Sequence, residues 1–290
     1  MVRASWNHFT LTGRVDDYLK FKEQEKEEQD GLGSLKEKVR GEQDRGTNVM
    51  VTGMVLTAMP ISEYDKRITI LTLERGKITA FARGARRPNS TLLAACNPFS
   101  FGQFEVYEGR TSYNVVRAEI KNYFTELTTD LNDTYYGFYF LEMAEYYAQE
   151  NSDDREMLKL LYQSLKALGK KNFDNRLVRV IYELKMMVLN GVYPNLFSCQ
   201  KCGRKEPMQF FSVQRAGLLC DSCSETKHGR RLDASTIYTM QYIITTESAK
   251  LFHFAVSEKV LFELIRTVKE FREKYAPHTF KSEQFLEGLF

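Results

Sequence analysis

The sequence has no long hydrophobic run, and it does not open with a secretion signal. In 290 residues there is no stretch of about 18 apolar residues, the length that a membrane-spanning helix requires. The chain begins MVRASWNHF, which lacks the apolar core of a secretory signal peptide. We therefore expect a cytosolic protein with no membrane partner, in a compartment where disulfides are rare.

Histidine is scarce, and the motifs of most enzyme classes are missing. The chain has 4 histidines, and none lies in an evident pairing with serine or cysteine. It contains no GxxxxGK[ST] phosphate loop, no GxSxG, no HExxH and no Rossmann glycine fingerprint. These absences favour a binding protein over an enzyme.

Cysteine is also scarce, yet four of the 5 cysteines lie between positions 199 and 223. They form two Cys-x-x-Cys pairs, Cys199 with Cys202 and Cys220 with Cys223. Each pair can direct two sulfurs at one point, and the separation of the pairs is typical of four-cysteine zinc sites. The segment between the pairs is long enough to form a short hairpin. Four protein ligands leave no position for water, so we predict one structural Zn²⁺ in loop 199–223.

Other interpretations of these cysteines stay open. Disulfides would require an oxidising compartment, and a thioredoxin-like redox pair would explain only one Cys-x-x-Cys. An iron–sulfur or rubredoxin-type iron site uses the same ligands, and spacing does not separate it from zinc. His228 lies nearby and could replace one ligand. The fifth cysteine, Cys96, lies in the apolar stretch LLAACNPF and is interpreted as a buried small hydrophobe.

The net charge is only +3, so attraction to nucleic acid requires local clustering. Between Lys66 and Arg117, nine basic residues stand against three acidic ones, a net charge of +6. Arginine forks suit phosphate oxygens, and Phe81, Tyr107 and Tyr113 could stack on bases. A solvated basic rim is the alternative interpretation. The candidate DNA-binding residues are Lys66, Arg67, Lys77, Arg83, Arg86, Arg87, Arg110 and Arg117.

Hydrophobic periodicity divides the chain into three parts. Residues 1–49 mix charges of both signs and predict a solvated helix or a disordered leader. Over 50–128, five segments with period two predict a small barrel of OB-fold or SH3-like type. Over 129–290 the period is helical, which predicts a helical domain with the cysteine loop inserted in it. The fold class is therefore α+β and multidomain.

The predicted elements have defined limits. The strands are 51–59, 66–73, 77–83, 102–109 and 111–120, and the helices are 135–149, 155–168, 176–190, 235–245 and 257–275. The first helix is predicted to be capped by Asn132 or Asp133, and the third by Asp174 or Asn175. Asp153 and Glu156 are predicted to form a capping pair for the second helix.

The barrel segment contains three short motifs: Ser62-Glu63-Tyr64-Asp65, Arg83-Gly84-Ala85-Arg86 with Ser90, and Asn97-Pro98-Phe99. Together they resemble the motifs of the RecO family of bacterial recombination mediators. The helical part, the cysteine insertion and the ending FKSEQFLEGL also look like the rest of that family. The resemblance covers about Met50 to Leu289 and rests on the combination, because each motif alone is weak.

This resemblance implies an OB-fold and a role in DNA repair by homologous recombination. Such proteins bind single-stranded and double-stranded DNA, anneal complementary strands, and contact the tail of single-stranded-DNA-binding protein. With RecR they help to load the recombinase RecA, and they make or break no covalent bond. The basic barrel face would be the DNA surface, in a protein of the bacterial cytoplasm and nucleoid.

The front of the chain departs from this family, whose members usually begin near the position of Met50. The segment SWNHFTLTGRVDDYLKFKEQEKE resembles YqzL, a very short protein often encoded just before RecO in Firmicutes. Either the two are fused here, or the start assigned to the chain is too early.

Two other functions fit parts of the pattern. A zinc-ribbon adaptor would bind protein and use the barrel as a docking surface. A nuclease would need an acidic metal cluster, which the sequence does not show.

Overall fold

The computed structural model describes residues 47–110, 112–170, 173–205, 207–224 and 229–287. The predicted leader, apart from residues 47–49, lies outside the described residues, as does His228. The chain divides into two units at Gly46, and the second unit runs from Thr47 to Phe290.

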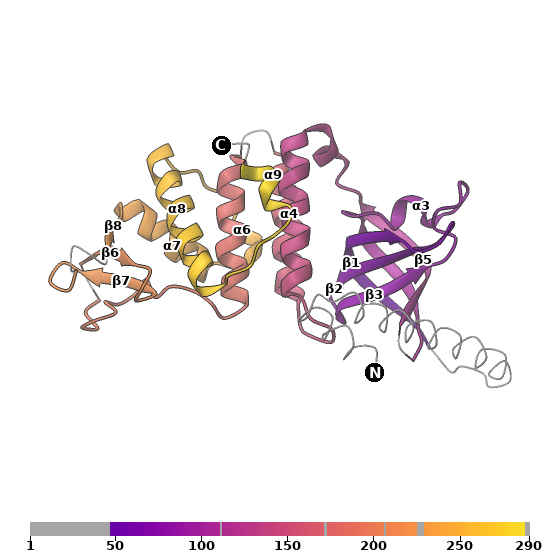
Figure 1. Ribbon diagram of the computed structural model, residues 1–290, viewed down its shortest axis with the longest axis horizontal. Coiled ribbons are helices and arrows are strands. Elements are labelled where there is room, and N and C mark those ends of the chain that lie inside the picture. Colours follow the sequence, from indigo (N-terminus) through magenta and orange to yellow (C-terminus); the bar gives the residue numbers. More distant parts are fainter. Residues whose placement is uncertain (1–46, 111, 171–172, 206, 225–228, 288–290) are drawn as a thin grey trace, which may run out of the picture. The chain divides into compact units, whose positions relative to one another are not determined.

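Five strands form a closed barrel near the start of this unit (Figure 1). They are β1 (Thr47–Pro60), β2 (Lys66–Thr72), β3 (Gly76–Ala82), β4 (Phe101–Glu108) and β5 (Tyr113–Asn122). Their order is β1-β2-β3-β5-β4, and β1 pairs with β4 to close the ring. All neighbours are antiparallel except β3 and β5. A five-stranded barrel with this order is an OB-fold, so the structure decides between the two predicted barrel types.

Alternation of side chains explains why these segments form a barrel. In β3, buried and half-buried residues alternate along the whole strand, so that Ile78, Ala80 and Ala82 face the interior. Cys96 is fully buried in the same core, as predicted for a small hydrophobe. It follows the short helix α3 (Leu92–Ala95), which the sequence analysis did not predict.

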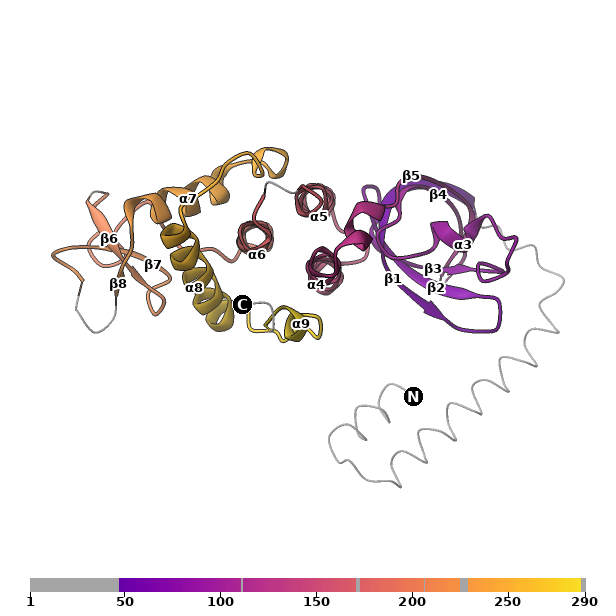
Figure 2. The ribbon, with the colours of Figure 1, turned by 90° about the horizontal axis from the view of Figure 1, so that it is seen from above.

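Helices make up most of the remaining chain. They are η1 (Thr125–Thr129), α4 (Leu131–Tyr147), α5 (Arg155–Leu168), α6 (Asn175–Leu189), α7 (Ala234–Thr245), η2 (Ser248–Lys250), α8 (Glu258–Tyr275) and α9 (Glu283–Glu287). Figure 2 looks nearly along α4, α5 and α6, which therefore appear as rings. Their apolar faces form one core, which also includes Met54, Leu56 and Leu71 of the barrel. The barrel therefore packs directly against the helices.

The predicted helix caps were partly right. Asp174 caps α6 by accepting a hydrogen bond from the backbone nitrogen of Arg176 at 2.8 Å. The cap of α4 is Asp130, so the prediction of Asn132 or Asp133 was wrong. The capping pair of α5 was also wrong, because Glu156 accepts a hydrogen bond from Lys159 instead.

The cysteine loop lies between α6 and α7. It contains a small antiparallel sheet of β6 (Met208–Ser212), β7 (Gly217–Cys220) and β8 (Arg230–Arg231), in the order β7-β6-β8. The predicted hairpin between the cysteine pairs is therefore present, and β8 adds a third strand. No described helix has both the length and the apolar character that crossing a membrane requires.

Candidate functional site

Two loops at one end of the barrel are held together by Asp65. The pairings of Lys66 with Ala82 and of Ala80 with Tyr113 place the β1–β2 loop beside the end of β3 and the start of β5. Asp65 Oδ1 accepts a hydrogen bond of 2.8 Å from the backbone nitrogen of Gly84. Gly84 has a φ of +67°, in the left-handed region that favours glycine. The carboxylate of one loop thus fixes the basic turn of the other.

Further bonds dock the two loops. The backbone nitrogen of Arg86 donates to the carbonyl oxygen of Tyr64 at 2.9 Å, and its guanidinium Nη1 donates to the carbonyl oxygen of Ser62 at 2.8 Å. The Arg87 guanidinium carbon lies 5.3 Å from the centre of the Tyr64 ring. The Ser-Glu-x-Asp and Arg-Gly-x-Arg motifs are therefore two halves of one structural unit.

This unit also explains the charge state of Asp65. The hydrogen bond from Gly84 lowers the pKa of the Asp65 carboxyl, and the positive charges of Arg83 and Arg87 act in the same direction. Asp65 is therefore ionised at neutral pH, while both arginines remain exposed to solvent.

A row of outward side chains continues from these loops across the barrel. Strand register places the members side by side in the order Met59, Arg67, Phe81, Asn114 and Tyr107. Met59 is 52% exposed, which is unusual for a long apolar side chain in a strand. Strands 2 and 3 and the loops beside them are where OB-folds bind oligonucleotides. The row has the mix of arginine and aromatic groups that single strands require.

Six of the eight predicted DNA-binding residues are exposed, and we call them the barrel arginine surface: Arg67, Arg83, Arg86, Arg87, Arg110 and Arg117. In the described part of the chain, none of the six guanidinium groups forms an ion pair. Arg110 lies in the β4–β5 loop, and Arg117 lies on β5 opposite Glu105 of β4. Arg86 and Arg67 each use one N–H donor within the protein, but a guanidinium group has five donors, so all six keep others for phosphate oxygens.

The structure places the other two predicted residues differently. Lys66 Nζ donates to Asn97 Oδ1 at 2.7 Å and to the carbonyl oxygen of Cys96 at 3.3 Å, and burial lowers its pKa. Lys77 Nζ donates to the carbonyl oxygen of Glu145 in α4 at 2.7 Å. Both amines are engaged within the protein, so we leave them out of the barrel arginine surface.

The four cysteines come together as the sequence predicted. Their sulfur atoms all lie within 4.8 Å of one another, and the sulfurs of Cys202 and Cys220 are 3.7 Å apart. Zn–S bonds of about 2.3 Å in a tetrahedron would separate the sulfurs by roughly 3.8 Å. The cluster therefore fits a four-coordinate metal ion.

Backbone turns aim the sulfurs inward. In the first turn, Cys199 nitrogen donates to the oxygen of Arg204 at 2.7 Å, and Gly203 nitrogen donates to the oxygen of Cys199 at 2.9 Å. Gly203 has a φ of +75°, so a side chain here would strain the turn. In the second turn, Cys223 and Ser224 both donate to the oxygen of Cys220 at 2.9 Å.

The same turns favour a thiolate at one ligand. Burial opposes ionisation of Cys199, but backbone N–H groups, that of Cys220 first, outweigh it and lower the pKa to about 6. The Cys223 thiol donates to the sulfurs of Cys202 and Cys220, which raises its pKa to about 12. These cysteines are the only group of three or more metal-binding side chains gathered among the described residues, so a nuclease-type carboxylate cluster is missing there.

Comparison with known families agrees with this architecture. The family "Recombination protein O N terminal" matches residues 48–124, and "Recombination protein O C terminal" matches residues 128–284. The DNA repair protein RecO of Desulforamulus reducens is 28% identical over 240 residues, covering 82% of this chain and 93% of that protein. RecO of Alkaliphilus metalliredigens is 29% identical over 229 residues (77% and 92%), and RecO of Acetivibrio thermocellus is 28% identical over 240 residues (82% and 96%). The chain therefore belongs to the RecO family of DNA repair proteins.

Proposed function

We propose that the chain is a recombination mediator that binds single-stranded and double-stranded DNA and anneals complementary strands. With RecR it would help to load RecA onto DNA coated by single-stranded-DNA-binding protein, whose tail it would contact. It works in the bacterial cytoplasm at the nucleoid and catalyses no reaction. The observation that carries this proposal is the barrel arginine surface, six exposed guanidinium groups without ion pairs beside a row that includes Phe81 and Tyr107.

The chemistry of annealing explains why such a surface is useful. Two strands repel each other through their phosphates, and arginines that neutralise the phosphates of one strand lower that repulsion. Phosphate contact and stacking carry little sequence information, so strands of any sequence can be held. The base edges must stay available for pairing, which stacking of a base face on a ring permits.

We also propose a division of labour along the chain. Residues 50–128 would bind DNA, residues 129–290 would brace the barrel, and the leader 1–49 would be dispensable apart from residues 47–49, which belong to strand β1. Cys199, Cys202, Cys220 and Cys223 would hold one Zn²⁺, which closes loop 199–223 and supplies no open coordination site. Zinc would therefore stabilise the loop and take no part in chemistry.

A strand-annealing assay tests the proposal against the two other functions. Complementary single strands, one labelled, are mixed with the full chain without ATP, with and without Mg²⁺. The proposal predicts faster duplex formation in both conditions and intact strands. Mg²⁺-dependent cleavage would identify a nuclease, and unchanged annealing without cleavage would favour a zinc-ribbon adaptor.

A further inference from the structure

A groove lies beside the cysteine loop, far along the chain from the barrel. It has a volume of about 740 Å³ and runs between the residues before Cys199, strand β6 and helix α7. We call it the α7 groove, and the lining residues that matter here are Phe197, Lys205, Met208, Gln209, Tyr238 and Gln241.

Two aromatic side chains of this groove are exposed. Phe197 is 47% exposed and comes from the segment after α6, while Tyr238 is 68% exposed and comes from α7. Neither ring is needed for the core at that exposure. Exposed rings on both sides of a groove are suited to stacking on a flat ligand, such as a nucleobase.

The charge around the groove is positive. From Cys199 to Arg231 the sequence has seven basic and three acidic residues, a net charge of +4. Lys205 lines the groove, and its neighbour Arg204 is also exposed; neither has an ion-pair partner among the described residues. None of the described residues that line the groove carries a carboxylate. This surface therefore attracts a polyanion more than a neutral apolar peptide.

Two amide side chains in the groove keep hydrogen-bonding groups available. Gln241 donates through Nε2 to the carbonyl oxygen of Leu196 at 2.7 Å, which leaves its Oε1 as an acceptor. Gln209 accepts through Oε1 from Arg231 at 2.9 Å, which leaves its Nε2 as a donor. An acceptor and a donor together match the polar edge of an unpaired base.

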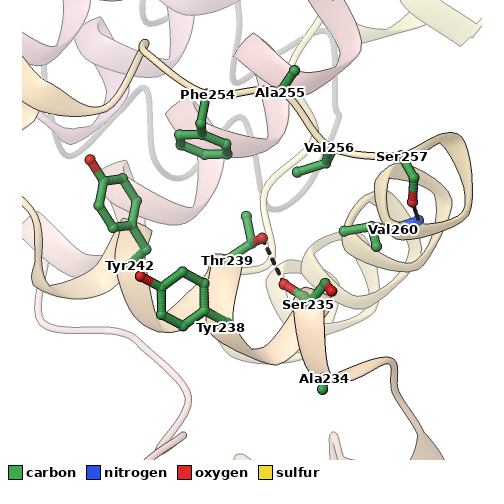
Figure 3. Close-up of a pocket in the computed structure, with 10 residues that line it drawn as sticks. All are labelled: Ala234, Ser235, Tyr238, Thr239, Tyr242, Phe254, Ala255, Val256, Ser257 and Val260. Carbon is green, nitrogen blue, oxygen red and sulfur yellow. Dashed lines mark hydrogen bonds between the residues drawn. The ribbon is translucent and has the colours of Figure 1, made fainter.

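A second pocket, on another side of α7, provides a contrast (Figure 3). It has a volume of about 750 Å³ and is lined by aromatic and small side chains, with Ala234 and Tyr238 shared between the two. Tyr242 and Phe254 lie edge to face in it, with ring centres 5.4 Å apart. None of the described residues that line this pocket is charged. Both sites therefore have aromatic surface, and charge is what distinguishes them.

We propose that the α7 groove binds an unpaired nucleotide of single-stranded nucleic acid, with the base between Phe197 and Tyr238 and a phosphate at Lys205. This site goes beyond the proposed function, which places DNA on the barrel arginine surface. A chain with two separate nucleic-acid sites can hold two strands, or two parts of one strand, at once.

Photo-crosslinking of the full chain with a 4-thiothymidine oligonucleotide tests this site. The crosslinked peptides are identified by mass spectrometry, so the groove and the barrel are read separately. The proposal predicts crosslinks to the segments that contain Phe197 or Tyr238. The double variant Phe197→Ala with Lys205→Glu should reduce these crosslinks about tenfold or more and leave the barrel crosslinks unchanged. Phe254→Ala, in the uncharged pocket, should leave both sets unchanged.

Three outcomes would overturn the proposal. Crosslinks confined to the barrel would remove the groove as a nucleic-acid site while supporting the proposed function. Groove crosslinks that persist in the double variant would place the strand elsewhere on the helical part. A short acidic peptide that binds the groove, where the oligonucleotide does not, would identify a protein-docking site. Crosslinks in the groove alone would instead support this inference and contradict the proposed role of the barrel.

Discussion

Asp65 and Gly84 join the β1–β2 loop to the turn that carries Arg83, Arg86 and Arg87, through a 2.8 Å hydrogen bond from the Gly84 nitrogen to Asp65 Oδ1. An acidic residue at a surface proposed to bind DNA should repel phosphate, so its presence there needs a reason. The hydrogen bond supplies the reason, because Asp65 fixes the turn that carries Arg83, Arg86 and Arg87. We interpret Asp65 as a positioning residue.

The first prediction separates the two effects of Asp65. Asp65→Asn keeps an acceptor for the Gly84 nitrogen and removes the charge, so affinity for single-stranded DNA should stay equal or rise. Asp65→Ala removes the acceptor as well, so affinity should fall several-fold despite the lost negative charge. Fluorescence anisotropy with a labelled oligonucleotide measures both variants. Equal behaviour of the two variants would show that the hydrogen bond does not position the arginines.

The pH dependence of this contact has a definite sign. Because the pKa of Asp65 is lowered in the folded protein, its stabilising effect is present above the ordinary aspartate pKa of about 3.9. The effect is lost only as the pH falls through the lower folded value. The contact is therefore intact across the physiological range.

The second prediction concerns a buried ion pair in the helical part. Glu183 accepts hydrogen bonds of 2.7 Å from Arg179 Nε and from the Tyr139 hydroxyl, and its side chain is 4% exposed. Glu183→Gln leaves the buried Arg179 with less compensation, so the free energy of unfolding should fall by about 3 kcal/mol. Glu156→Gln, which breaks the exposed pair with Lys159, should cost about 0.5 kcal/mol or less. Urea denaturation of both variants measures the difference.

Acid should reveal the same pair. Burial opposes the charge of Glu183, but Arg179 and Arg272 outweigh it, so its pKa is lowered in the folded state. The stabilisation is present above the ordinary glutamate pKa of about 4.3 and is lost as the pH falls through the folded value. Below pH 4 the wild type should therefore lose stability faster than Glu183→Gln. Parallel acid titrations would contradict this assignment.

The third prediction concerns the metal. The purified full chain should contain one zinc per molecule, and Cys220→Ser should contain almost none, because three ligands bind zinc much more weakly than four. The variant should be cleaved by proteases within loop 199–223 while the barrel stays resistant. Cys96→Ala, in the barrel core, should keep the zinc. Elemental analysis showing iron, or no metal in the wild type, would refute the zinc assignment.

The fourth prediction concerns where the barrel begins. Strand β1 starts at Thr47, and Thr47, Asn48 and Val49 pair with Glu108, Tyr107 and Val106 of β4. A chain that starts at Thr47 should match the full chain in stability and DNA binding. A chain that starts at Met50 loses these pairings and the bond from Asn48 to Glu105, which should cost about 1–2 kcal/mol. Loss of DNA binding in the Thr47 version would show that the leader contributes to function.

The sequence predicts the barrel well because period two is a strong signal in short strands. The sequence could also have excluded Lys66 from the predicted DNA-binding residues. Adjacent residues of a strand face opposite sides, so Lys66 is on the same side as the buried Ile68. Arg67 is on the other side of the strand and is exposed. The partners of Lys66, Cys96 and Asn97, lie about 30 residues away, and no local pattern shows them.

Other features had no readable signal in the sequence. Helix α4 begins at Leu131, which is 64% exposed, so the buried apolar face of the helix starts after its first residue. A cap predicted from the apolar pattern is therefore placed too late in the sequence. Strand β8 has only two residues, too few to show a period. The α7 groove brings together residues from positions 197 to 241, and only the folded chain makes them neighbours.

The most direct measurement of the central claim is a salt titration of single-stranded DNA binding. The variant Arg83→Ala, Arg86→Ala and Arg87→Ala is compared with the wild type and with Lys166→Ala, Lys170→Ala and Lys274→Ala. The control removes the same charge from exposed positions in the helical part. Each phosphate contact on single-stranded DNA contributes about 0.7 to the slope of log affinity against log salt. If all three arginines contact phosphate, the variant should therefore have a slope smaller by about 2. The control should keep the wild-type slope. An unchanged slope and affinity in a folded arginine variant would contradict the account and place the DNA site outside the barrel arginine surface.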